Sequence, residues 1–159
     1  STLHTNNAAG AVTRLLDMGI EPFLVASSVD GLVAQRLVRR LCSSCKRPKE
    51  IDRDELERAG FPMDQLGDGT IHEAVGCESC RMTGFRGRTG IYEIIVVDDA
   101  IRPLIVGRAA ANEIKAVALT KGMRTLREDG WWKVLTGITT IEEVLRVTDD
   151  DEALTETLV

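Results

Sequence analysis

The sequence predicts a mixed α/β protein in which a small antiparallel sheet lies between helical segments. Two observations support this fold class. The 159 residues are 43% hydrophobic and 28% charged, which is typical of a globular chain with a hydrophobic core. Helix-like spacing of apolar residues also alternates along the chain with strand-like runs, and glycine, proline or asparagine marks the changes.

The first part of the chain is expected to form helices and then a strand. A helix over residues 8–18 begins at an asparagine cap, Asn6 or Asn7, and is followed by a glycine stop signal. A second, short helix over 22–27 begins at a proline. Residues 31–41 fit a strand about as well as a helix by apolar spacing, and their valines and leading glycine favour the strand.

The middle of the chain is expected to contribute a helix and further strands. Asp52 and Glu55 resemble a capping box at the start of a helix over 53–59. Residues 70–75 are expected to form a strand, and residues 91–97 another, after a basic stretch that three glycines interrupt.

The last part of the chain has helical periodicity. A helix capped by Asp98 or Asp99 is expected to end near residue 106, and further helices are expected over 112–121, 125–135 and 141–147. The last of these begins with a capping box.

The four cysteines form two C-x-x-C pairs, Cys42 with Cys45 and Cys77 with Cys80. Two such pairs can complete a tetrahedral shell of four thiolates around zinc. Because sulfur then fills every position, the zinc is expected to be structural. Glycines at 76 and 84 would allow tight turns around the second pair. Redox disulfides, a disulfide scaffold and free thiols are the alternatives.

The net charge of −5 is unevenly distributed. Residues 1–48 carry six Lys/Arg and three acids, whereas residues 49–159 carry fourteen and twenty-two, a net of −8. An acidic zinc module does not suit a protein that binds a phosphate backbone. No apolar run approaches the ~20 residues of a membrane span. We therefore expect a cytoplasmic chain without a nucleic-acid partner.

The first residues lack an initiator methionine and a polar lead-in, so we expect a C-terminal piece of a longer protein. His4 lies in a polar loop just before the first helix, where α/β nucleotide enzymes place groups that face a ligand. By local chemistry alone, a loop histidine bonded to backbone is the alternative.

Six blocks and the cysteine pairs occur in the order and spacing of one known family. The blocks are Ser-Thr-Leu-His-Thr-Asn at 1–6 and the segments 22–28, 35–39, 87–93, 123–130 and 137–148. They closely resemble the type II secretion and type IV pilus assembly ATPases, whose histidine box matches the first block. Asn7 stands where the family often has aspartate. The four-cysteine insert points to the secretion and pilus-extension branch.

The resemblance implies three parts, and the five acids without a base in the last eleven residues imply a fourth. Residues 1–41 would be the end of a RecA-like ATPase motor domain, and residues 42–97 a four-cysteine zinc subdomain. Residues 98–148 would form a helical C-terminal subdomain, and residues 149–159 a loosely ordered acidic tail.

The resemblance also implies a hexameric traffic ATPase that meets assembly proteins of an inner-membrane platform. The family's Walker A loop, aspartate box and Walker B carboxylate precede its histidine box, and this chain has no G-x-x-x-x-G-K-[ST]. ATP and Mg²⁺ would therefore bind in the full-length parent, and this chain alone would be inactive. His4 is expected to act as a phosphate-sensing catalytic residue. Arg36 and Arg39 would support the nucleotide site or a subunit interface, with solvated strand charges as the alternative.

Two rival functions belong to other classes. A zinc-ribbon module for nucleic acid would use Arg81, Arg86 and Arg88 beside the cysteines, although the acidic balance and the single nearby aromatic residue, Phe85, argue against it. A redox protein would cycle its thiols as disulfides instead of binding metal.

Overall fold

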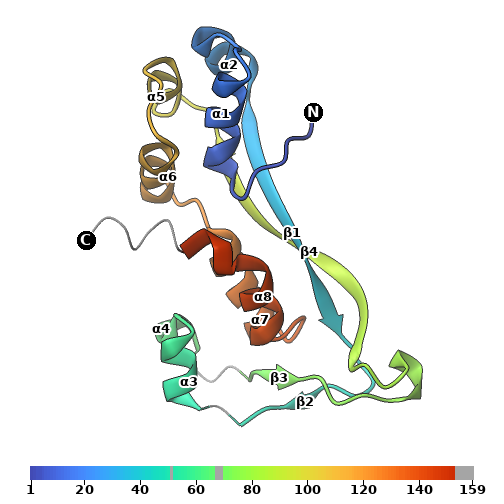
Figure 1. The fold of residues 1–159 in the computed structure, drawn as a ribbon. Helices are drawn as coiled ribbons and strands as arrows, with labels where there is room; N and C mark the ends of the chain where they lie inside the picture. Colours follow the sequence, from blue (N-terminus) through green and yellow to red (C-terminus); the bar gives the residue numbers. More distant parts are fainter. Residues whose placement is uncertain (51, 67–69, 153–159) are drawn as a thin grey trace. The chain divides into compact units, whose positions relative to one another are not determined.

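The structure, a computed structural model, describes residues 1–50, 52–66 and 70–152 (Figure 1). It is a mixed α/β fold, as predicted. The chain divides into two compact units, residues 1–35 with 92–126 and residues 36–91 with 127–159. None of the helices in the described ranges has both the length and the apolar character that a bilayer crossing requires.

The two long strands, β1 (Gly31–Leu41) and β4 (Phe85–Val96), pair with each other. The Val97 amide donates to the Asp30 carbonyl at one end and the Cys42 amide to the Gly84 carbonyl at the other, both at 2.9 Å, so the strands run antiparallel. β1 has the predicted bounds. β4 starts six residues before the predicted residue 91, because the strand includes the glycine-rich stretch, where Gly87 adopts φ +77°.

A second, very short sheet pairs β2 (Arg47–Pro48) with β3 (His72–Glu73) in antiparallel orientation. The sequence predicted a strand over 70–75, and the structure keeps two residues of it. It did not predict β2. The small antiparallel sheet that was expected is therefore two separate two-stranded sheets within the described residues.

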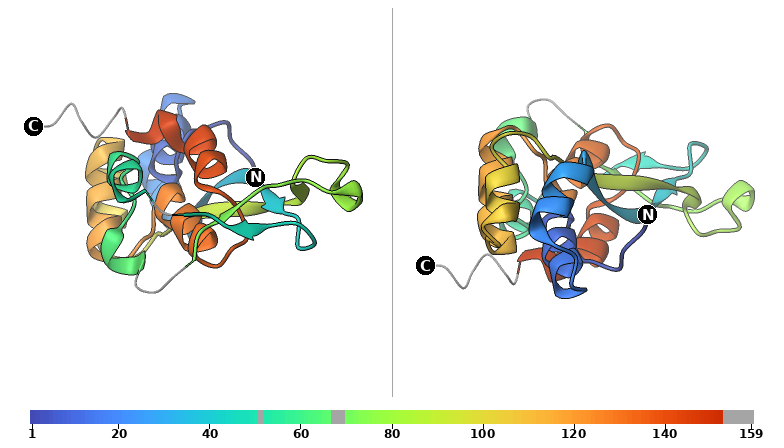
Figure 2. Two further views of the ribbon diagram at one scale, coloured as in Figure 1. Left: turned by 90° about the horizontal axis from the view of Figure 1, so that it is seen from below. Right: turned by 90° about the horizontal axis from the view of Figure 1, so that it is seen from above.

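The first unit packs two helix pairs together. Its helices are α1 (Ala8–Asp17), α2 (Pro22–Ser28), α5 (Arg102–Val106) and α6 (Ala111–Thr120). Figure 2 shows α1 and α2 beside α5 and α6, and contacts join α1 to α6 and α2 to α5. Val12, Val25 and Ile114 are buried in this unit. The predicted asparagine cap is Asn7, whose side chain accepts the Gly10 amide at 2.8 Å.

α5 begins later than a cap at Asp98 or Asp99 predicts. The Asp98 carboxylate accepts the amides of Ala100 (3.0 Å) and Ile101 (3.2 Å). This forms a turn that precedes the helix.

The second unit is built on a core shared by distant segments. Its helices are α3 (Arg53–Arg58), α4 (Met63–Leu66), α7 (Leu126–Leu135), α8 (Ile141–Glu152) and the 3₁₀ turn η1 (Glu78–Cys80). Buried side chains from α3, α4 and their flanks pack against buried side chains of α7 and α8. These core residues are Leu56, Phe61, Leu66, Ile71, Trp131, Val134, Ile141 and Val144.

The segment between the cysteine pairs is therefore packed against the C-terminal helices rather than standing alone. The rings of Phe61 and Trp131 lie 5.2 Å apart between centroids, a distance typical of a favourable aromatic pair. The sequence did not predict α4. The four-part division of the chain at residues 41, 97 and 148 stays a prediction.

The C-terminal helix is longer than predicted. α8 continues to Glu152 instead of ending near residue 147, so the first residues of the expected acidic tail, 149–152, are helical. The remainder of that tail, residues 153–159, lies outside the described residues.

Candidate metal centre

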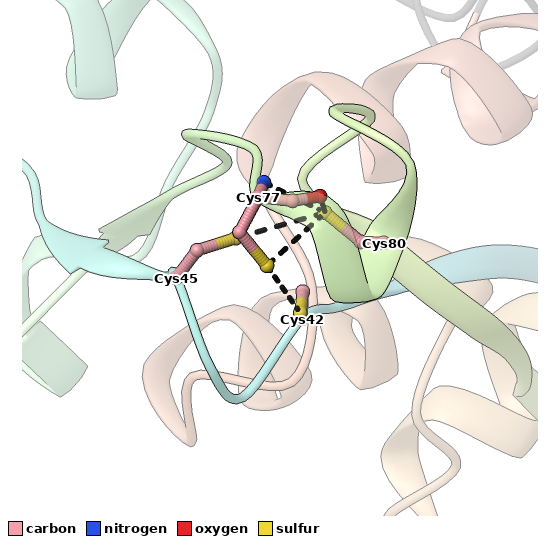
Figure 3. A group of neighbouring side chains, drawn as sticks. All are labelled: Cys42, Cys45, Cys77 and Cys80. Atoms are coloured by element: carbon pink, nitrogen blue, oxygen red, sulfur yellow. Dashed lines mark hydrogen bonds between the residues drawn. The ribbon is translucent and has the colours of Figure 1, made fainter.

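The end of β1 and the beginning of β4 both adjoin a pair of cysteines. Cys42 directly follows β1, and Cys45 lies one turn later. Cys77 caps η1 and Cys80 is its last residue, shortly before β4. The four sulfur atoms all lie within 4.8 Å of one another (Figure 3). The two pairs that the sequence separates by a 31-residue spacer therefore face each other in one cluster.

The sulfur–sulfur distances fit a metal shell. Sγ–Sγ is 3.9 Å for Cys42–Cys77 and 3.8 Å for both Cys45–Cys80 and Cys77–Cys80. A tetrahedral zinc with bonds of about 2.3 Å has edges of about 3.8 Å. Disulfide sulfurs would lie about 2.05 Å apart, and all four cysteines are free. The cluster can hold a metal ion, as predicted.

Backbone amides point at two of the sulfurs. Cys45 Sγ accepts the Gly76 amide at 3.3 Å, and Cys80 Sγ accepts the amides of Cys77 and Gly84 at 3.2 Å each. Burial acts against ionisation of Cys80, yet these amides lower the pKa of its thiol to about 6. Burial raises the pKa of the Cys45 thiol to about 12. The cluster thus already favours a thiolate at one corner.

Two glycines make the second turn possible. Gly76 has φ +114°, and a Cβ there would lie 2.7 Å from the Met82 carbonyl oxygen. Gly84 has φ +74°, and a Cβ there would lie 2.6 Å from the Ala74 Cβ. Any larger residue at either position would force the backbone apart. The prediction that these glycines permit tight turns is confirmed.

The first cysteine turn is held by the loop between α7 and α8. The Leu41 amide donates to the Ile138 carbonyl, the Thr139 hydroxyl to the Arg39 carbonyl, and Lys46 Nζ to the Gly137 carbonyl, all at 2.8 Å. These contacts span about a hundred residues of sequence, so local patterns gave no sign of them.

A buried carboxylate lies close to this turn. Glu143, 2% exposed, accepts the Arg39 amide (2.9 Å) and the Arg39 guanidinium (2.8 Å). Arg146 binds the same carboxylate through Nε (3.1 Å) and Nη2 (2.9 Å). Burial opposes ionisation, but these hydrogen bonds lower the pKa of Glu143 from 4.5 to about 2.

The sequence missed this role because it assigned Glu143 to a helix cap. The cap does form in part, since the Glu143 amide donates to the Thr140 hydroxyl at 3.4 Å. The arginines of β1 were the available signal in the sequence. Which of them meets Glu143 depends on how β1 lies against α8, and only the fold decides that.

The residue predicted to sense phosphate and the two predicted to support the nucleotide site or a subunit interface lie in different units. His4 is exposed in the first unit, in the extended segment before α1. Arg36 is partly buried and Arg39 is exposed, and both belong to the second unit. Arg39 is engaged by Glu143, and its guanidinium lies 4.1 Å from the centre of the Phe85 ring.

The residues of the nucleic-acid alternative are not arranged as a stacking surface. Arg81 and Arg88 are exposed, and Arg86 donates to the Ser79 hydroxyl at 3.2 Å. The Arg39 guanidinium covers one face of Phe85, which limits base stacking on the nearby aromatic residue.

Comparison with known proteins places these features in a family. Residues 1–146 match the type II/IV secretion system protein family. The type II secretion system protein E of Pseudomonas aeruginosa is 53% identical over 151 residues, which is 95% of this chain and 30% of that protein. The type IV pilus assembly ATPase PilB of Thermus thermophilus is 50% identical over 145 residues, 91% of this chain and 16% of that protein. The chain therefore spans less than a third of these relatives.

A solved structure shares the fold. The crystal structure of the pilus retraction motor PilT with bound ADP superposes with a TM-score of 0.57 over 98% of this chain and 33% of that one, at 19% identity. At this identity the likeness concerns the fold alone.

Proposed function

Because the chain belongs to the type II/IV secretion system protein family, we propose that it is the C-terminal part of a hexameric traffic ATPase. ATP hydrolysis by the whole protein would power type II secretion or type IV pilus assembly. The observation that carries this proposal is the match over residues 1–146, with 53% identity to a type II secretion protein E across 95% of the chain.

The chain would supply only some of the residues that act on ATP. It contains no G-x-x-x-x-G-K-[ST], so the phosphate-cradling loop and the carboxylate that holds Mg²⁺ would come from the rest of the protein. ATP would supply the phosphoryl group, and Mg²⁺ would neutralise the charge that develops on it. His4, exposed ahead of α1, would contact the terminal phosphates and report their hydrolysis.

The two arginines of β1 would have different roles. Arg39 holds the buried carboxylate of Glu143, so it would support the motor by fixing α8 to the strand. Arg36 lies three residues before Arg39 in β1, so its side chain belongs to the opposite face of the strand. It is partly buried and would serve the nucleotide site or a subunit interface.

The metal is proposed to be a structural Zn²⁺. Four sulfurs at tetrahedral spacing suit zinc and leave no position for water or substrate. The ion would fix the turns that connect β1 and β4 to the segment between the cysteine pairs. Cobalt substitution tests this, because Co²⁺ in a tetrahedral four-thiolate site has intense visible absorption that six-coordinate or oxygen-ligated Co²⁺ lacks.

The whole protein is proposed to work in the cytoplasm, at the inner membrane through partners. Assembly proteins of a membrane platform would bind it, with no nucleic acid involved. Arg81 and Arg86 are exposed beside the metal cluster and could reach a neighbouring subunit or the platform. The segment between the cysteine pairs would contact partners through its polar side, because its apolar residues pack in the core of the second unit.

An ATPase assay on the full-length protein tests the proposal. The wild type should hydrolyse ATP, and His4→Ala should lower kcat while the affinity for ATP stays within a few-fold. A large loss of affinity would assign His4 to binding instead of sensing. A wild type that binds duplex DNA at low salt but hydrolyses no ATP would overturn the proposal in favour of a nucleic-acid module.

A further inference from the structure

Glu93 is a buried carboxylate for which the functional site described above has no use. It lies in β4, in the Gly-Arg-Thr-Gly-Ile-Tyr-Glu segment, and is 0% exposed. Ile91 and Ile95, its neighbours on the same face of the strand, are equally buried. An acidic residue at such a position is rare and needs a polar partner.

That partner is the beginning of α1. Glu93 Oε1 accepts the Ala8 amide at 2.9 Å, across 85 residues of sequence. Ala8 is the first residue of α1, and amides of a helix's first turn have no acceptor within the helix. Ala8 is itself 1% exposed, so solvent does not reach its amide while Glu93 is in place. The positive end of the helix also favours an acidic group there.

The same helix turn anchors the segment that carries His4. The Asn7 side chain accepts the Gly10 amide at 2.8 Å. A Cβ built on Gly10 would lie 3.9 Å from the Thr5 Cβ, so Thr5 lies directly over this turn. His4 immediately precedes Thr5, and residues 5–8 are therefore tied to α1 on one side and to β4 on the other.

We propose that Glu93 is a positioning residue for the histidine loop, residues 1–6, and acts through the Ala8 amide at the start of α1. The inference rests on the proposed function for the role of His4. Glu93 does not touch the nucleotide, since its side chain is enclosed between β4 and α1. Glu93 would affect hydrolysis only by fixing the position of the histidine loop. Misplacement of a reacting or sensing group by about 1 Å can lower a rate on the order of 10²-fold.

A double-mutant cycle in the full-length protein tests this. Glu93→Ala should lower kcat roughly 10- to 100-fold with KM for ATP within about threefold, as His4→Ala does. Combining the two should lower kcat no further than His4→Ala alone, because both remove the same interaction. Glu93→Gln keeps an oxygen acceptor at the same reach and should restore kcat to within about threefold of the wild type. Ile95→Val is the matched control, a mild change in the same buried face that leaves Ala8 bonded.

The possible outcomes distinguish the positioning role of Glu93 from the proposed function. Two results would overturn the positioning role while leaving the ATPase proposal intact. One is a double variant in which the two losses of kcat multiply. The other is a folded Glu93→Gln protein whose kcat is as low as that of Glu93→Ala. A wild type without hydrolysis would overturn the proposed function. A His4→Ala variant with full kcat would overturn only the role of His4. Either result removes the positioning role of Glu93 as well.

A second variant covers the case in which Glu93→Ala does not fold. Glu93→Asp retains the acid but is one methylene too short to reach the Ala8 amide. If it folds with a lowered kcat and unchanged KM, the positioning role holds. Unchanged kcat in a folded Glu93→Asp would overturn it.

Discussion

Replacing Glu143 by glutamine should reveal how strongly the buried carboxylate fastens α8 to β1. The carboxylate accepts hydrogen bonds from the backbone and side chain of Arg39 and from the side chain of Arg146. Glutamine has nearly the same shape but lacks the charge, and its amide group would direct donors at one of the guanidinium groups. The variant therefore removes the charged contact while keeping the size of the side chain.

The size of the effect follows from the pKa. Hydrogen bonds that lower the pKa of Glu143 from 4.5 to about 2 correspond to roughly 3 kcal/mol of stability. Both arginines are about half exposed, at 51% and 57% of their side-chain area, so solvent reduces this to about 2 kcal/mol.

The pH dependence has a defined direction. Because the folded-state pKa is lowered, the stabilisation is fully present above pH 4.5 and is lost as the pH falls from there towards 2. The gap in unfolding free energy between wild type and Glu143→Gln should therefore be greatest near pH 7 and should shrink by more than half by about pH 3.

Urea denaturation at both pH values measures this gap. Glu142→Gln is the control, because Glu142 is 65% exposed and its ion pair with Lys49, at 3.3 Å, lies at the surface; it should cost less than about 1 kcal/mol. Wild type, Glu143→Gln and the control carry the same cysteine cluster, so any loss of metal at low pH would affect all three alike. A gap for Glu143→Gln below 0.5 kcal/mol at pH 7, or one equally large at pH 3, would refute the reasoning.

Three other predictions concern the metal cluster and the chain's own activity. The purified chain should bind one zinc ion, and Cys42→Ser or a chelator should unfold the second unit, since structural zinc contributes on the order of 10 kcal/mol in small peptides; metal analysis with circular dichroism checks this. Gly84→Ala should lower the free energy of unfolding by at least about 2 kcal/mol and weaken metal binding. Gly87→Ala, with nothing within 4 Å of its Cβ, should lower it only by the ~1 kcal/mol of its positive φ. Equal losses of stability would contradict the steric argument. The chain alone should not hydrolyse ATP above background in a phosphate-release assay, because it lacks a Walker A lysine.

Local signals predicted the helices and long strands better than the connections between them. The Asn7 cap, the proline at the start of α2 and the valine-rich β1 each depend on neighbours in sequence, and the structure confirms them. β4 was predicted too short because glycines usually interrupt strands, and here Gly87 is accommodated within one. β2 was missed because two residues carry no periodicity.

The sequence by itself determined the four cysteines that can hold a metal ion and the family, since paired cysteines at fixed spacing and blocks in a fixed order are properties of the chain. Only the tertiary structure decided which groups bind the two buried carboxylates. Glu143 with Arg39 and Glu93 with Ala8 are separated by 104 and 85 residues. Such contacts depend on how strands and helices are placed against one another, and periodicity or capping rules describe only interactions a few residues apart.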